Sequence, residues 1–70
     1  MNNKYAIHIF WSEDDSAYVA ICDEFPNLSA LGETREEALR EAQEALDLTI
    51  ETYVGRGLSL PTPTSILAAA

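Results

Sequence analysis

The sequence predicts an α+β domain in which a three-stranded antiparallel sheet is followed by one long amphipathic helix. Two observations carry this prediction. Apolar segments rich in β-branched and aromatic residues fill the first half of the chain, and a helix-capping signature precedes a helical pattern in the second half. The 70 residues have room for one domain, which we expect to span residues 1–70.

The first two strands are expected to form a hairpin. Residues 4–11 and 17–22 are both rich in side chains that favour strands. The run at 12–16 between them consists of Ser, Glu and Asp, which favour a turn. The two strands therefore lie antiparallel and begin the sheet.

The third strand is expected to be short. Residues 23–27 are predicted to be a connection, because Pro26 has no backbone N–H to donate to a neighbouring strand. Residues 28–31 then form the third strand. Gly32 ends it, in a tight turn that a side chain would strain.

The helix begins at a capping box. The Thr34 hydroxyl is placed to accept a hydrogen bond from the Glu37 amide, and the Glu37 carboxylate is placed to reach back. From residue 36 onward, one arc of roughly 140° collects the core-facing positions, which are Ala38, Leu39, Ala42, Ala45, Leu46, Thr49, Ile50 and Tyr53. A separate arc collects the carboxylates, which are Glu36, Glu37, Glu41, Glu44, Asp47 and Glu51. Gly55 or Gly57 ends the helix.

The segment after the helix is expected to be extended, because Pro61 and Pro63 disfavour helical backbone before them. Residues 65–70 are either a last edge strand, at about 65–68, or a frayed end. With that strand the order of elements is β-β-β-α-β.

Both faces of the first strand are apolar, which predicts self-association. An antiparallel sheet with one hydrated face alternates apolar and polar residues, and one helix cannot cover two faces. We expect a homodimer, or a dimer of dimers, through the sheet face or edge away from the helix. The pattern does not decide which strand face meets the helix, so Trp11 and Phe10 are alternative contacts. The candidate interface residues are Tyr5, Ile7, His8, Phe10, Trp11 and Tyr18.

The composition excludes several classes of protein. Twelve acidic residues against four basic ones give a net charge of −8, while 47% hydrophobic residues are too many for a disordered acidic tail. Such a charge repels nucleic-acid phosphates, and no apolar run approaches the ~20 residues of a membrane span. A single cysteine, Cys22, makes no internal disulfide and favours the reducing cytoplasm. The charge favours a basic partner, or simply solubility.

No catalytic, cofactor or metal site is predicted. His8 lies between two isoleucines, which favours a packed or interface residue over a general base. Cys22 has no second thiol near it and is interpreted as a small core residue rather than a nucleophile. The carboxylates of Glu37, Glu41 and Glu44 follow helical spacing on an outward face, which indicates a solvated surface.

Several short motifs together resemble the HicB family of antitoxins, specifically its small N-terminal domain. They cover nearly the whole chain and are YAIHI at 5–9, AYVA at 17–20, FPNL at 25–28, GETREEAL at 32–39, EAL at 44–46 and GLSLPTP at 57–63. The box Gly-x-Thr-x-x-Glu-Ala-Leu after a Phe-Pro turn is fairly specific in this combination.

The resemblance implies a partly degenerate ribonuclease-H-like fold whose fourth strand joins beside the first. It also implies a function, the neutralisation of a small, basic, mRNA-cleaving toxin of the HicA type by direct binding, which the net charge of −8 suits. Ribonuclease H carboxylates are not carried over, because residues 4–11 hold no Asp or Glu. The family's DNA-binding domain is not expected within residues 1–70. The alternative is an orphan homo-oligomeric binding or scaffold module with no toxin partner.

Overall fold

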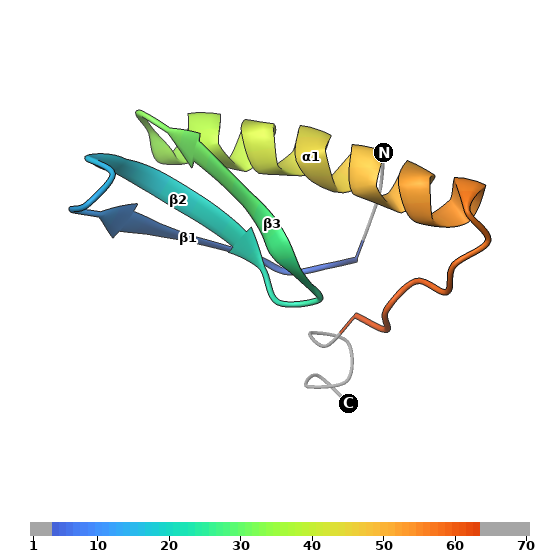
Figure 1. Cartoon of the computed structure of the whole chain (residues 1–70). Coiled ribbons are helices and arrows are strands. Elements are labelled where there is room, and N and C mark those ends of the chain that lie inside the picture. Colours follow the sequence, from blue (N-terminus) through green and yellow to red (C-terminus); the bar gives the residue numbers. More distant parts are fainter. Residues whose placement is uncertain (1–3, 64–70) are drawn as a thin grey trace.

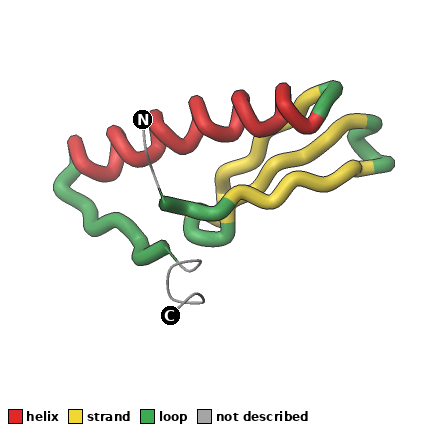
Figure 2. The backbone as a smooth tube through the Cα atoms, turned by 180° about the vertical axis from the view of Figure 1, so that it is seen from behind, coloured by secondary structure: helices red, strands yellow, loops and turns green. Residues whose placement is uncertain are grey.

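The computed structural model describes residues 4–63 and contains one sheet and one helix (Figure 1). The elements in chain order are β1 (Ile7–Ser12), β2 (Ala17–Cys22), β3 (Phe25–Gly32) and α1 (Arg35–Gly55). The strands form an antiparallel sheet in the order β1-β2-β3, and α1 lies along one side of it (Figures 1 and 2). The predicted α+β class is confirmed. The further strand predicted at 65–68 lies outside the described residues.

The β1–β2 hairpin forms as predicted, with a later start for its first strand. The register runs from Ile7 opposite Cys22 to Ser12 opposite Ala17. β1 begins at residue 7 rather than 4 because β2 ends at Cys22, the residue opposite Ile7, so the ladder between the two strands starts there. In the turn, the Ser12 hydroxyl donates to Asp15 Oδ2 at 2.9 Å and accepts from the Asp15 amide at 3.3 Å.

β3 is longer than predicted and contains Pro26. The register places Ile21 opposite Ser29 but Cys22 opposite Phe25, so three residues of β3 bulge away from the ladder between these pairs. Pro26 lies in this bulge and on an edge strand, where its missing N–H costs no ladder hydrogen bond. The prediction that residues 23–27 are a connection was therefore wrong from Phe25 onward.

The predicted capping box is confirmed at the start of α1. Thr34 has extended backbone angles, and its Oγ1 accepts from the Glu37 amide at 3.0 Å. The Glu37 carboxylate reaches back and accepts from the Glu33 amide at 2.8 Å, one residue before the cap. The Thr34 contact satisfies one N–H group that the helix itself leaves unpaired, and the Glu37 carboxylate satisfies the amide of Glu33 just before the cap.

The C-terminus of α1 is closed by a Schellman motif. Gly57 has a φ of 70°, and its amide donates to the Val54 carbonyl at 3.1 Å. The Leu58 amide donates to the Tyr53 carbonyl at 2.9 Å. Gly55 is thus the last helical residue and Gly57 the left-handed one, which assigns a separate role to each of the two predicted helix ends.

Small residues bring α1 close to the sheet. Ala20 on β2 and Ala38 and Ala42 on α1 are fully buried against one another, with Ala30 packed beside them. A second cluster of larger residues lies toward the C-terminal half of α1 and consists of Cys22, Phe25, Leu28 and Leu46. Phe25 connects β3 with α1 there, because its ring meets the Tyr53 ring edge-on at a centroid distance of 5.3 Å.

Gly32 is required by this close approach rather than by its own backbone conformation. Among the described glycines only Gly57 has a positive φ. A Cβ on Gly32 would lie 2.4 Å from the Ala38 nitrogen and 2.9 Å from its Cα, which are backbone atoms that cannot rotate away. The glycine expected to relieve a tight turn therefore makes room for the first turn of α1.

Replacing Thr34 by Ala removes the side-chain cap of α1. We expect the Thr34→Ala change to lower the free energy of unfolding by about 1 kcal/mol. Urea denaturation measures this change. Thr52→Ala is the matched control, because Thr52 is an exposed helical residue whose hydroxyl only donates to the Leu48 carbonyl within the helix. An unchanged midpoint for Thr34→Ala would contradict the cap.

Replacing Gly32 by Ala overpacks the contact between β3 and α1. We expect Gly32→Ala to lower the free energy of unfolding by about 1–3 kcal/mol. Gly55→Ala is the control, since nothing lies within 4 Å of the added methyl group and Ala favours a helix. Thermal unfolding of the two variants compares them directly. Equal stability in both would show that the close approach at Gly32 does not exist.

Candidate functional site

The sheet has one face that no described element covers. The side chains of this face alternate with those turned toward α1 and come from all three strands. We call it the open sheet face; it consists of His8, Phe10, Val19, Ile21, Ser29 and Leu31. Figure 2 shows α1 along the other side of the sheet.

One apolar row crosses the middle of the open sheet face. The register aligns Phe10 on β1 with Val19 on β2 and with Leu31 on β3. Val19 is buried between its neighbours, whereas Phe10 is 46% exposed and Leu31 is 52% exposed. Large apolar side chains gathered at this exposure in a contiguous row mark an interaction surface.

The structure shows which face of β1 packs against the helix. Ile7 and Ile9 pack against the two core clusters, so their side of β1 is the helix side. Phe10 and His8 lie on the opposite side. Trp11 belongs to the helix side by alternation but remains 47% exposed near the hairpin turn, where its ring meets the Tyr18 ring edge-on at 5.2 Å.

The other predicted interface residues have partners within the chain. Tyr5 donates its hydroxyl to the Pro61 carbonyl at 2.6 Å, and its ring meets Phe25 edge-on. The Arg35 guanidinium lies 4.9 Å from the centre of the Tyr18 ring, a cation–π contact. Of the six candidates, His8 and Phe10 lie on the open sheet face, and contact of any of them with a partner stays a prediction.

Leu31 was not among those candidates, although it is the more exposed end of the apolar row. Its side could not be assigned from the sequence, because the bulge at Pro26 hides where the ladder of β3 begins. The signal that the sequence did offer was the alternation along β2, which puts Val19 and Ile21 on one face of that strand and Tyr18, Ala20 and Cys22 on the other.

His8 lies at the rim of the open sheet face beside a carboxylate. Its Nε2 lies 3.1 Å from Asp23 Oδ2, and the two side chains are both more than half exposed. Water screens such a pair, so it contributes little to stability. The contact holds the Asp23 carboxylate against the histidine.

A second surface lies on the side of α1 turned away from the sheet. Half of the chain's twelve acidic residues are on this helix, as predicted. We call the surface the acidic helix face; it consists of Glu36, Glu37, Glu41, Glu44 and Glu51. Asp47, predicted on the same arc, is only partly exposed, and one of its carboxylate oxygens is buried. Ala38, Ala42 and Leu46 form the buried stripe on the opposite side of the helix.

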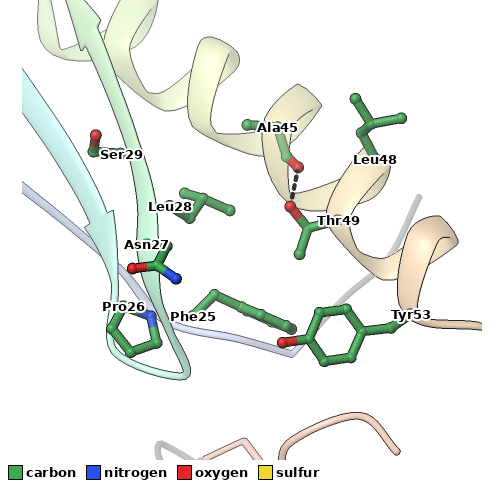
Figure 3. Close-up of a pocket in the computed structure, with 9 residues that line it drawn as sticks. All are labelled: Phe25, Pro26, Asn27, Leu28, Ser29, Ala45, Leu48, Thr49 and Tyr53. Atoms are coloured by element: carbon green, nitrogen blue, oxygen red, sulfur yellow. Dashed lines mark hydrogen bonds between the residues drawn. The ribbon is translucent and has the colours of Figure 1, made fainter. Parts of the chain in front are cut away.

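An apolar groove borders the acidic helix face. It encloses about 420 Å³ between β3 and α1, and its walls are Phe25, Pro26, Asn27, Leu28, Ser29, Ala45, Leu48, Thr49 and Tyr53 (Figure 3). The walls carry no ionised side chain, and the Thr49 hydroxyl is engaged with the Ala45 carbonyl at 2.8 Å. The groove therefore suits an apolar side chain of a partner rather than a reaction.

Leu48 connects the groove with the carboxylates. It is 66% exposed, which is the highest value among the exposed large hydrophobic residues of residues 4–63. On the helix it is four residues after Glu44 and three before Glu51, so these three side chains are surface neighbours. An apolar residue with charged neighbours has the layout of an interface centre with a polar rim.

Cys22 packs in the core, as predicted. It is 2% exposed, and its Sγ donates to Glu24 Oε1 at 3.4 Å. Burial raises the pKa of the Cys22 thiol, and the neighbouring Glu24 carboxylate adds to this by favouring the protonated form. A nucleophilic cysteine needs the opposite shift.

The described residues offer no metal ligand set, since no three His, Cys, Asp or Glu side chains in 4–63 are grouped to hold an ion. The helix in this range is also too polar for a bilayer crossing.

Comparison with known proteins gave one match. A family model described as "HicB_like antitoxin of bacterial toxin-antitoxin system" matches residues 4–69. Searches of curated proteins and of solved structures found no match.

Proposed function

Because the chain belongs to the HicB-like antitoxin family, we propose that it neutralises a small, basic, mRNA-cleaving toxin of the HicA type by binding it directly. The family match over residues 4–69 is the observation that carries this proposal. Antitoxins of this family are typically binding proteins without catalysis. The two surfaces and the groove are accordingly interpreted as docking sites.

The distribution of charge supports a basic partner. The chain has a net charge of −8, and the acidic helix face concentrates carboxylates on one side of α1. Opposite charges on two proteins raise the rate of encounter and orient the approaching partner. A toxin that binds RNA presents positive charge where it contacts phosphates. An acidic helix that covers this surface would compete with RNA for it.

We place the toxin contact on the acidic helix face with Leu48 at its centre. The carboxylates of Glu44 and Glu51 flank this exposed leucine, and the groove beside it accepts an apolar side chain. Surface charges alone give speed and orientation, whereas an apolar anchor in a desolvated centre contributes most of the affinity. Both features occur together on this side of the molecule.

The partly degenerate ribonuclease-H-like fold is also part of the proposal. The hydrogen bond from the Tyr5 hydroxyl to the Pro61 carbonyl supports it. This contact brings the segment after α1 back to the start of β1. We further propose that the protein works in the cytoplasm, where a lone cysteine stays reduced.

The alternative is a homo-oligomeric module of the same family without a toxin. The open sheet face supports this reading, because an exposed apolar row favours association whether or not a toxin exists. A neighbouring gene for a short, basic protein distinguishes the antitoxin from the module without a toxin. Its presence favours the antitoxin, and its absence favours the orphan module.

Charge reversal on the acidic helix face tests the proposed contact. We expect Glu41→Lys with Glu44→Lys to weaken binding of the co-expressed basic toxin about tenfold or more, equivalent to about 1.4 kcal/mol or more. The matched control is Glu13→Lys with Asp14→Lys, which changes the net charge equally in the exposed β1–β2 turn. Calorimetric titration of the purified proteins measures the two affinities.

Two results would count against this contact. Equal weakening by both double variants would show that only the total charge matters. Failure of the unaltered chain to co-purify with the toxin at micromolar concentration would remove the antitoxin function itself.

A further inference from the structure

We infer that a second copy of this chain covers the open sheet face, so that two sheets pack face to face and the two α1 helices lie outside. The inference concerns the opposite side of the molecule from the proposed toxin contact. The inferred dimer does not depend on the toxin. Three features of the structure support it, and they are independent of one another.

The first feature is the small core of the single chain. Its fully buried residues include Ala20, Ala38 and Ala42, and the largest side chains below 2% exposure are Leu46 and Cys22. A chain of 70 residues buries only about 60% of the surface that it exposes when unfolded, which leaves little net stability. Phe10 and Leu31 are about half exposed. Burying them between two copies adds the apolar contact that the single core lacks.

The second feature is the charge of the open sheet face. None of its six residues is acidic, and its one titratable side chain, His8, is paired with Asp23. Two copies of a chain with net charge −8 repel each other wherever their carboxylates meet. The six residues of this face carry no carboxylate, so two copies meet over them without opposing such charges. A basic toxin gains no attraction there and is drawn to the acidic helix face instead, so a second copy is the occupant that fits.

The third feature is the symmetry of the apolar row. Val19 lies on the central strand, with Phe10 and Leu31 on the two edge strands at either side of it. A two-fold axis along the strands places Val19 over its own copy and Phe10 over the second copy's Leu31. A two-fold interface needs this kind of self-complementary surface. Each large ring then faces a smaller side chain, which keeps the two sheets evenly spaced.

This arrangement leaves both acidic helix faces free and far apart. If the proposed function also holds, each copy in the dimer binds one toxin, and the two kinds of contact do not compete. That consequence rests on the proposed toxin contact, whereas the dimer itself does not.

Light scattering after size exclusion tests the dimer. We expect the chain to elute at twice 7.7 kDa at tens of micromolar and to dissociate on dilution. Leu31→Asp and Phe10→Asp should each shift the midpoint of dissociation at least tenfold upward. Leu58→Asp is the matched control, because Leu58 is 51% exposed against 52% for Leu31 and lies after α1. A 7.7 kDa species at every concentration, or dissociation by Leu58→Asp alone, would overturn the inference.

Disulfide trapping keeps the inference testable if an aspartate variant fails to fold. A mixture of Phe10→Cys and Leu31→Cys chains should form a disulfide between copies on mild oxidation, because the face-to-face arrangement places these positions opposite each other. The Leu58→Cys chain is the control. Crosslinking in the mixture that is no faster than in this control would contradict the arrangement.

Toxin binding by the Leu31→Asp chain separates the two proposals. A monomeric Leu31→Asp chain that binds the toxin one-to-one supports separate surfaces. Loss of toxin binding by a folded Leu31→Asp chain would place the toxin on the open sheet face and overturn this inference. A dimer that never binds the toxin leaves the sheet-face contact supported and removes only the antitoxin function.

Discussion

The close approach of α1 to the sheet is the contact on which the rest of the structure depends. Ala20, Ala38 and Ala42 are fully buried against one another. At Gly32 there is no room for even a methyl group, because the backbone of Ala38 lies too close. Small residues let the helix lie close to β2 and β3. In this part of the core, dispersion contacts between closely packed small residues stabilise the fold in place of contacts between long side chains. Bound in this way, the single helix occupies one face of the sheet, and no other described element covers the second face.

The positions of the two surfaces follow from that contact. The buried stripe of α1 fixes the rotation of the helix, which turns the carboxylates away from the sheet and brings Leu48 beside the groove. The same contact leaves Phe10 and Leu31 on the other side, about half exposed. A family of antitoxins acts by binding, and this chain has an acidic surface and an apolar surface on opposite sides. We interpret the first as the contact for a basic partner and the second as the contact between copies.

Local signals predicted the elements that local interactions determine. The capping box depends on Thr34 and Glu37, three residues apart, and β2 is bounded by turn residues next to it, so both followed from the sequence. Pro26 misled the assignment of β3, because a bulge on an edge strand tolerates proline and the ladder partner determines the bulge. The helix side of β1 could not be predicted, since Ile9 and Phe10 are both apolar. The small residue Ala20, opposite Ile9, marks the side that the helix approaches closely.

Carboxyl footprinting of the toxin complex tests the central claim, that the acidic helix face is the contact for a basic partner. Carbodiimide labelling followed by mass spectrometry compares the chain alone with the chain bound to toxin. We expect Glu41 and Glu44 to become protected while Glu13 and Asp14 in the hairpin turn label as before. Protection confined to the turn, or none on α1 in a complex that has formed, would contradict it.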